Sequence, residues 1–125
     1  MIRYLIDADA AVYAMDVNHM RLTERIGQCA PGEIAISVIS YAEVAFGTYA
    51  GKPPPPEILE VFIQAIPLLT FDEAAAREYA KLPFKRARFD RLLAAHALSI
   101  GATVITNHEA DFADVPGLEV ENWSK

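Results

Sequence analysis

The feature that most constrains this sequence is a set of three short apolar runs, each followed at once by polar or helix-starting residues. The runs are residues 2–6, interrupted only by Arg3, residues 34–37 and residues 102–106. Short, nearly continuous apolar segments are typical of β-strands that are buried on both faces of a sheet. The runs therefore predict the centre of a parallel sheet.

The segments between these runs carry helical patterns. The clearest spans residues 89–100, where apolar side chains recur three or four positions apart and Gly101 ends the pattern. Further elements are expected as helices over residues 40–49, over residues 56–65, and from the capping residue Asp72 to Ala80, with a weaker strand at residues 67–71.

Strands that alternate with helices pair in parallel through right-handed crossovers. The expected fold class is therefore an α/β sandwich. A length of 125 residues suits a single domain that spans residues 1–125. Pro53 to Pro56 hold their segment extended, which predicts a stiff spacer between helices and no domain boundary.

The charge balance limits how the chain can bind nucleic acid. It has 11 basic and 17 acidic side chains and a net charge of −6, so any contact with RNA has to come from local charge or from a metal. No stretch approaches the ~20 apolar residues that span a bilayer. The lone Cys29 suits a reducing compartment. We expect a cytoplasmic protein that does not contact the membrane.

Acidic residues follow the predicted strands or begin the predicted helices. Asp7 and Asp9 come directly after the first run, Asp111 follows the last run, Glu43 lies early in the second-run helix, and Asp90 opens the last helix. In parallel α/β folds, ligands bind beyond the carboxyl ends of the strands. These acids are therefore expected to converge at one edge of the sheet.

A carboxylate cluster of this kind needs a cation. Two charges about 5 Å apart repel by roughly 3 kcal/mol at an effective dielectric near 20. Mg²⁺ or Mn²⁺ takes oxygen ligands, keeps several waters and can activate one of them against a phosphodiester. The acidic pattern therefore favours a metal-dependent phosphodiester hydrolase.

Each acid also has a purely structural explanation. Asp7 and Asp9 can cap the helix that follows the first strand. Ser40 and Glu43 have the spacing of a capping box. Asp90 suits the positive end of a helix dipole, and Asp111 can initiate a turn.

Considered together, four segments resemble the PIN-domain ribonucleases, in particular the VapC-type toxins of bacterial toxin–antitoxin pairs. Residues 4–13 are similar to that family's opening strand with its first acid, and residues 36–47 to the helix that carries its second acid. The most specific similarity covers residues 89–98 and continues through residues 104–112 to 116–118 and 121–123.

This resemblance implies a PIN-like three-layer α/β/α sandwich with a central, mostly parallel sheet. By position, the metal-binding and catalytic acids would be Asp7, Glu43, Asp90 and Asp111. Thr106 and Asn107 would supply supporting polar contacts. The implied activity is Mg²⁺- or Mn²⁺-dependent endonucleolytic cleavage of structured RNA such as tRNA, and a cognate antitoxin protein would block the site.

The sequence departs from the family pattern after the first acid. Ala8 stands where the family usually has Thr or Ser, and Asp9 stands where it usually has Asn. A hydroxyl is therefore missing and a carboxylate is added. Asp9 can be a metal ligand, an outer supporting group or a helix cap. The segment between Tyr79 and Asp90 also looks shorter than in many relatives.

Five of the eleven cations are concentrated within eleven residues around Asp90. One interpretation is a solvated face beside the helix. The other is that these cations offset the acidic edge and hold RNA phosphates. The predicted RNA-binding residues are Lys85, Arg86, Arg88 and Arg91, with Lys81 in the same stretch.

Other side chains allow more than one role. His96 is expected to be a hydrogen-bonded interior residue, whereas His108, near Asp111, is either solvent-exposed or in contact with RNA or metal. Trp123 is expected to cover the core. Five further apolar residues are expected either in the core or in a groove for the antitoxin or a second copy of the chain: Val44, Phe46, Tyr49, Val61 and Phe62.

Two other functions compete with the ribonuclease hypothesis. The Asp7-Ala8-Asp9 motif after a strand resembles haloacid-dehalogenase-type phosphatases, in which Asp7 would be the nucleophile. Alternatively, the chain is a PIN-fold binding module without catalysis, which the missing hydroxyl at Ala8 would support. Retention of all four principal acids speaks against this module.

Overall fold

The computed structural model describes residues 1–83, 86 and 88–125. Its helices and strands follow one another as β1 Tyr4–Ile6, α1 Ala8–Ala14, α2 Met20–Gly27, β2 Ile34–Ser37, α3 Val38–Tyr49, α4 Pro56–Ala65, β3 Leu68–Leu69, α5 Glu73–Ala80, α6 Arg88–Ile100, β4 Thr103–Ile105, the 3₁₀ helix η1 Glu109–Phe112 and β5 Val120–Glu121.

The strands form one parallel sheet with the order β3-β2-β1-β4-β5. The central pairs place Ile6 beside Ile36 on one side and beside Ile105 on the other. The three apolar runs are thus the three central strands, as predicted. Both edge strands have only two residues, and β5 was not predicted.

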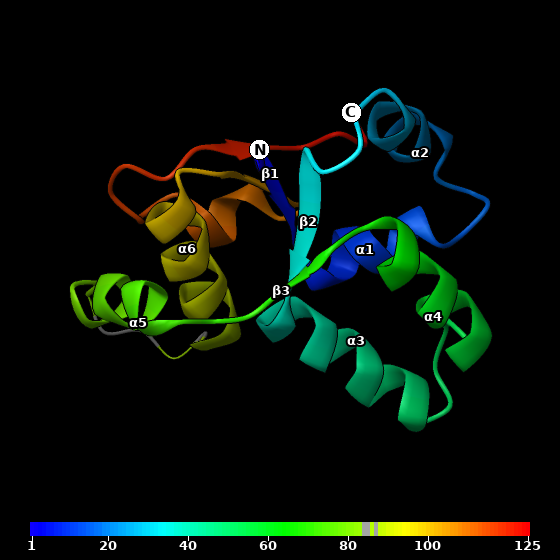
Figure 1. Cartoon of the computed structure of the whole chain (residues 1–125), viewed down its shortest axis with the longest axis horizontal. Helices are drawn as coiled ribbons and strands as arrows, with labels where there is room; N and C mark the ends of the chain where they lie inside the picture. The colour runs from blue at the N-terminus through cyan, green and yellow to red at the C-terminus, as the bar shows by residue number, and fades with distance from the viewer. Residues whose placement is uncertain (84–85, 87) are drawn as a thin grey trace.

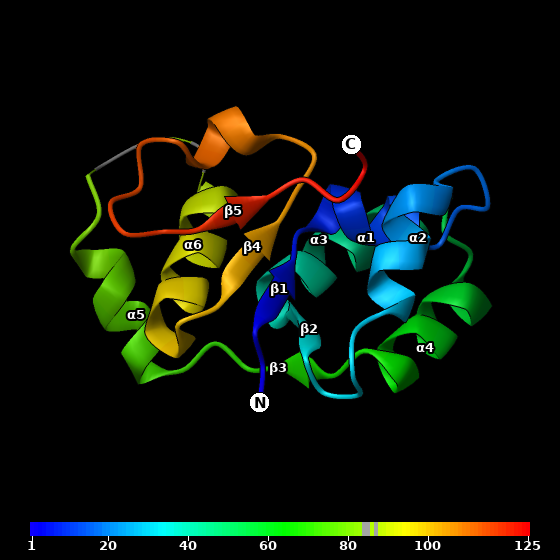
Figure 2. The same cartoon turned by 90° about the horizontal axis from the view of Figure 1, so that it is seen from above.

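Helices cover both faces of the sheet. Leu5, Ala35 and Val104 pack against α6, whereas Ile6 and Ile36 face the cluster that includes residues of α1 to α4. Figure 1 shows α5 and α6 on one side of the strands and α1 and α4 on the other, and Figure 2 shows the same division from above. The three-layer α/β/α sandwich is therefore confirmed. No helix in the described ranges is both long and apolar enough to cross a membrane.

Helix α2 was not predicted because few of its residues are apolar, although those few lie on one side of the helix. Leu22 is its only fully buried residue. The residue before the helix, His19, makes no capping hydrogen bond with its side chain. The helix packs on the α1 side of the core through this narrow contact, so its sequence carries only a weak signal.

Helix α3 begins two residues earlier than predicted. The Ser37 hydroxyl caps it by accepting a hydrogen bond from the Ile39 N–H at 3.1 Å. Ser40 therefore lies inside the first turn, where its hydroxyl is buried without a hydrogen-bond partner among the described residues. The capping box proposed for Ser40 and Glu43 is wrong, and the Glu43 carboxylate has no capping role.

Candidate metal and catalytic site

Asp7 lies where β1 passes into α1, at the carboxyl edge of the sheet. Its Oδ1 accepts a hydrogen bond from the Ala10 N–H at 2.8 Å, so it caps α1 as the structural explanation predicted. The Thr106 side chain also interacts with this carboxylate and favours its charged form. The bond from Ala10 restricts the orientation of the Asp7 side chain, which is only 7% exposed.

The pKa of Asp7 is raised to about 6. Burial is the main cause, and the neighbouring charges of Asp9 and Asp90 contribute in the same direction. The bonds from Thr106 and Ala10 act in the opposite direction. The capping bond therefore stabilises one oxygen of Asp7. It does not remove the repulsion between the Asp7 carboxylate and the neighbouring charges of Asp9 and Asp90.

Glu43 and Asp90 approach the same place from two different helices. Glu43 lies in the second turn of α3 and Asp90 in the first turn of α6. Burial raises the pKa of Glu43 to about 7, with further contributions from Asp90, Asp9 and Asp7. Two acids from opposite layers of the sandwich are thus close enough to influence one another.

Asp111 completes the group from η1. Burial raises the pKa of Asp90, and the next contributions come from Asp111 and Asp9, whereas His108 lowers it. The charges of Asp7, Asp9 and Asp90 act on Glu43, those of Asp9 and Asp90 act on Asp7, and that of Asp111 acts on Asp90, so the four predicted acids and Asp9 form one acidic cluster.

Asp9 has a partner that the sequence did not reveal. It is exposed in the first turn of α1, and its Oδ2 lies 3.0 Å from Nε2 of His108. His108 is exposed, as one of its two interpretations predicted. The added carboxylate is therefore paired with a side chain that comes from the loop after β4.

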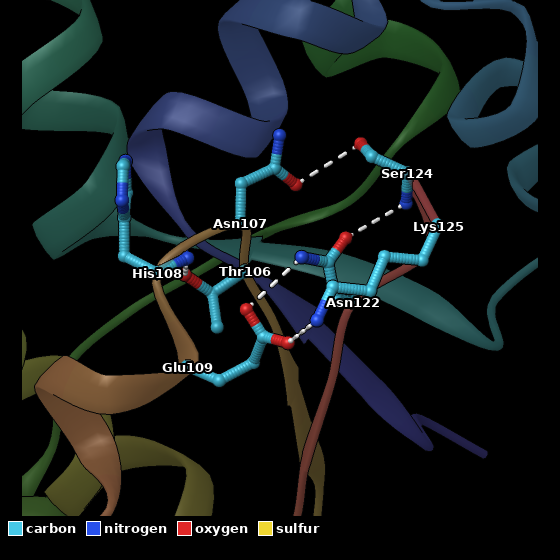
Figure 3. A network of polar contacts seen from close by, with 7 residues as sticks. All are labelled: Thr106, Asn107, His108, Glu109, Asn122, Ser124 and Lys125. Carbon is cyan, nitrogen blue, oxygen red and sulfur yellow. Dashed lines mark hydrogen bonds and ion pairs between the residues drawn. The ribbon is translucent and has the colours of Figure 1, made fainter.

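Thr106 and Asn107 point in different directions. Thr106 is fully buried and supports Asp7, as expected of a supporting contact. Figure 3 shows Asn107 turned toward the end of the chain, where its Oδ1 accepts a hydrogen bond from the Ser124 hydroxyl at 3.1 Å. The structure thus places the Asn107 side chain in a different set of contacts from that of Thr106.

The donor chemistry of this site suits a hard divalent cation. Among the described residues, no three His, Cys, Asp or Glu side chains are close enough to be direct ligands of one ion. Mg²⁺, however, is usually held by one or two carboxylates and completes its coordination with water and substrate phosphate. Burial, and after it the repulsion between neighbouring acids, raises the pKa values of Glu43 and Asp90, and a bound cation would stabilise the charged form of both carboxyls.

The basic stretch divides into exposed and buried parts. Arg86 and Arg88 are exposed, and Lys85 lies outside the described residues. Arg91 is only 2% exposed and donates to Oδ1 of Asp114 at 3.1 Å and to the Pro83 carbonyl at 2.8 Å. The prediction of Arg91 as an RNA contact is therefore corrected, because its guanidinium is used to anchor α6.

The remaining histidine and aromatic predictions can also be located. His96 is buried, with Nδ1 2.7 Å from the Ser37 hydroxyl, and Trp123 is buried against the core. Both predictions are confirmed. Among the five apolar residues, Val44 is buried and Phe62 packs against the core, whereas three are exposed: Phe46, Tyr49 and Val61.

No pattern in the sequence predicts the contacts made by Glu109. Hydrogen bonds from its own backbone N–H, from Asn122 and from Lys125 lower the pKa of this carboxyl to about 2. Its partners lie 13 and 16 residues further along the chain, in no recognisable motif. Only the fold brings them together, as Figure 3 shows.

The fold and the site together define a class of α/β proteins. In this class a parallel sheet flanked by helices has an acidic site at its carboxyl edge, and here the carboxylates come from the end of β1, from α3, from α6 and from η1. The PIN-domain family model matches residues 4–118, and the chain belongs to this family. This membership excludes the haloacid-dehalogenase-type alternative.

Relatives match along nearly the whole chain. The tRNA(fMet)-specific endonuclease VapC of Shigella flexneri is 27% identical and covers 99% of this chain and 100% of its own length. The VapBC2 structure from Rickettsia felis, bound to a DNA fragment from the promoter, has a TM-score of 0.84 at 27% identity and covers 98% of this chain and 99% of the matched one. A DNA-bound VapBC structure from Salmonella typhimurium has a TM-score of 0.83 at 26% identity, with coverage of 98% and 99%.

Proposed function

We propose that residues 1–125 act as one PIN-like domain, a Mg²⁺- or Mn²⁺-dependent endoribonuclease that is the toxin of a toxin–antitoxin pair. The observation that carries this proposal is the convergence of Asp7, Glu43, Asp90 and Asp111 at one edge of the sheet, where burial and neighbouring acidic charge raise the pKa values of three of them, Asp7, Glu43 and Asp90. These four acids would hold the cation. When bound, the cation supplies an activated water and neutralises charge on the leaving oxygen.

The protein side chains prepare this chemistry by orientation and charge. The Ala10 N–H holds one oxygen of Asp7 and so restricts the orientation of its carboxylate. Glu43 has to lose its proton before it can bind a cation, and its pKa of about 7 makes this loss depend on pH near neutrality. The pKa of Asp90 is also raised, first by burial and then by the charges of Asp111 and Asp9.

The substrate and partners follow from the relatives. The name of the Shigella flexneri protein specifies tRNA(fMet), which supports a structured RNA such as tRNA as the substrate here. The matched structures are VapBC complexes, which supports a cognate antitoxin as a partner. The exposed Phe46, Tyr49 and Val61 are apolar surface available to a second copy of the chain or to the antitoxin. We propose that the protein acts in the cytoplasm.

Metal removal tests the activity directly. Protein freed of antitoxin should cleave total cellular RNA or tRNA with Mg²⁺ or Mn²⁺, and EDTA should stop cleavage until the metal is restored. Product sizes on a denaturing gel are the readout. Binding of Mg²⁺ without cleavage of any RNA would instead favour the PIN-fold binding module.

Two exposed arginines, Arg86 before α6 and Arg88 at its first position, should act on substrate binding and leave the chemical step intact. Arg86→Ala combined with Arg88→Ala should raise the Kd for tRNA and lower the slope of log Kd against log salt by about one or two, because each lost phosphate contact reduces that slope by about one. Nuclease-inactive protein in a filter-binding assay gives both quantities.

The matched control is Arg3→Ala combined with Arg77→Ala. These two cations lie outside the basic stretch and are paired with Glu33 and Glu73. The control removes the same charge from positions away from the acidic cluster. If the slope of log Kd against log salt is equal in the two double variants, Arg86 and Arg88 belong to a solvated face with no role in RNA binding.

A further inference from the structure

Residues 122–125, here called the tail, hold the loop that supports the acidic site. We infer that Asn122 and Glu109 are positioning residues for metal binding, acting through loop 106–109. The inference rests on the proposed metal-dependent function and deepens it. It concerns residues that contact neither the substrate nor the four principal acids.

The tail makes hydrogen bonds to the loop at two points, which Figure 3 shows from close by. Asn122 Nδ2 donates to Glu109 Oε1 at 3.0 Å, and Lys125 Nζ donates to Glu109 Oε2 at 3.1 Å. On the other side of the loop, the Ser124 hydroxyl donates to Asn107 at 3.1 Å. The Ser124 N–H donates to Asn122 Oδ1 at 2.9 Å, so the two points are joined through the tail itself.

Loop 106–109 contacts the acidic cluster through Thr106 and His108. The His108 N–H donates to the Thr106 hydroxyl oxygen at 3.0 Å, which leaves the hydroxyl proton free to point to Asp7. His108 Nε2 lies 3.0 Å from Asp9. The Asp111 N–H donates to the His108 carbonyl at 3.0 Å. One short segment therefore sets the support of Asp7, the partner of Asp9 and the place of Asp111.

The tail contacts contribute more to position than to stability. Glu109 and Lys125 are partly exposed, and exposed ion pairs add little to the free energy of unfolding. Catalytic and metal-binding groups, in contrast, need positions held within about 0.5 Å, and loops reach this precision only when other contacts restrain them. Loss of the restraint should therefore appear in metal binding before it appears in folding.

A reversed hydrogen bond makes the test specific. Asn122→Asp sets a new carboxylate against Glu109 and breaks the contact. The pair Asn122→Asp with Glu109→Gln restores it in the opposite direction, because the new amide at 109 can donate to the new carboxylate at 122. The Ser124 N–H keeps an acceptor in both variants. Glu109→Gln alone retains the acceptor for Asn122 but loses both the charge and the acceptor that face Lys125.

The control variant is Glu33→Gln at the opposite edge of the sheet. Glu33 resembles Glu109 in its contacts, since it accepts from the Ala30 N–H at 2.7 Å and from the Arg3 guanidinium at 3.0 Å. It precedes β2, far from the carboxyl ends of the strands. Glu33→Gln therefore measures the cost of loosening a similar contact that has no connection to the acids.

Three quantities are measured for each variant: the Mg²⁺ concentration that gives half of the full rise in Tm, and kcat and KM for tRNA cleavage. Asn122→Asp should raise the Mg²⁺ midpoint about tenfold and lower kcat with KM unchanged, as expected when an outer partner of a metal site is lost. The Asn122→Asp, Glu109→Gln pair should return the midpoint to within about twofold of the original chain. Glu33→Gln should leave it unchanged.

The inference is overturned if Asn122→Asp lowers the metal-free Tm while leaving the Mg²⁺ midpoint and kcat as they are in Glu33→Gln. It is also overturned if the double variant remains as weak as Asn122→Asp alone. If the original chain neither responds to Mg²⁺ nor cleaves RNA, the proposed function fails first, and this outcome is recognised before any variant is compared.

Discussion

Asp7→Asn should reduce RNA cleavage by about 100-fold or more while leaving the metal-free Tm at or above that of the original chain. Asn caps a helix about as well as Asp, so the bond from the Ala10 N–H is retained. The substitution removes one charge from a cluster whose members repel each other. It also removes a ligand for the cation, whose loss should cost at least as much as loss of an outer partner. Circular dichroism melting and gel-based cleavage assays measure the two effects.

The chain provides a close control in Asp72→Asn. Asp72 caps α5 by accepting from the Ala75 N–H at 3.0 Å, in the same arrangement as Asp7, but it does not belong to the acidic cluster. This variant should keep both its activity and its response to Mg²⁺. The same comparison applies to Asp90→Asn. If Asp7→Asn and Asp90→Asn both lower the metal-free Tm and still cleave RNA, the metal-site interpretation has to be abandoned.

Without metal, the protein should become less stable as the pH rises from 5 to 8. The folded protein raises the pKa of Asp7 to about 6 and of Glu43 to about 7, so it holds protons that the unfolded chain has already lost. The resulting stabilisation is complete below the ordinary carboxyl pKa of about 4 and disappears as the pH passes through the raised values. For buried Asp7 this loss is about 1 kcal/mol between pH 5 and pH 8, a fall of about 3 °C in Tm for a chain of this size. Glu43 and Asp90 act in the same direction.

Saturating Mg²⁺ should reverse this trend, because the cation binds the deprotonated carboxylates and stabilises only the state that binds it. The control is Glu43→Gln, which should make the metal-free dependence of Tm on pH less steep, because the contributions of Asp7 and Asp90 remain. Melting curves at fixed ionic strength, with and without Mg²⁺, give the comparison. A metal-free Tm that rises steadily from pH 5 to pH 8 would contradict the raised pKa values.

The parts of the fold that the sequence predicted are those with a local cause. The central strands follow from apolar runs, and α4 begins and ends where its pattern does, at Pro56 and Ala65. The start of α3 was misplaced because Ser37 and Ser40 are both acceptable caps, and the contact between Ser37 and His96 is visible only in the folded chain. Strand β5 has two residues, and its pairing with β4 defines it.

The same distinction holds for the site. The principal acids could be named because each stands at the end of a strand or near the start of a helix, where topology alone brings them together. The burial of Arg91 could not be foreseen, since its partner Asp114 lies 23 residues away and nothing in the basic stretch distinguishes an inward cation from an outward one. The pairing of Asp9 with His108 joins opposite ends of the chain and has no local signal at all.

The central position of β1 delays assembly of the site during protein synthesis. This strand is made before the other strands of the sheet, yet in the folded protein it lies between β2 and β4. The Asp7 N–H, directly after β1, donates to the carbonyl of Ile105 in β4. During translation, Asp7 therefore emerges from the ribosome long before β4. The sheet edge that carries the acidic site is complete only after β4 has been made. Long-range pairing of this kind forms late and slowly. A nuclease built in this order cannot attack RNA while most of its own sequence is still being translated, and its partner can meet it at the moment when activity first becomes possible.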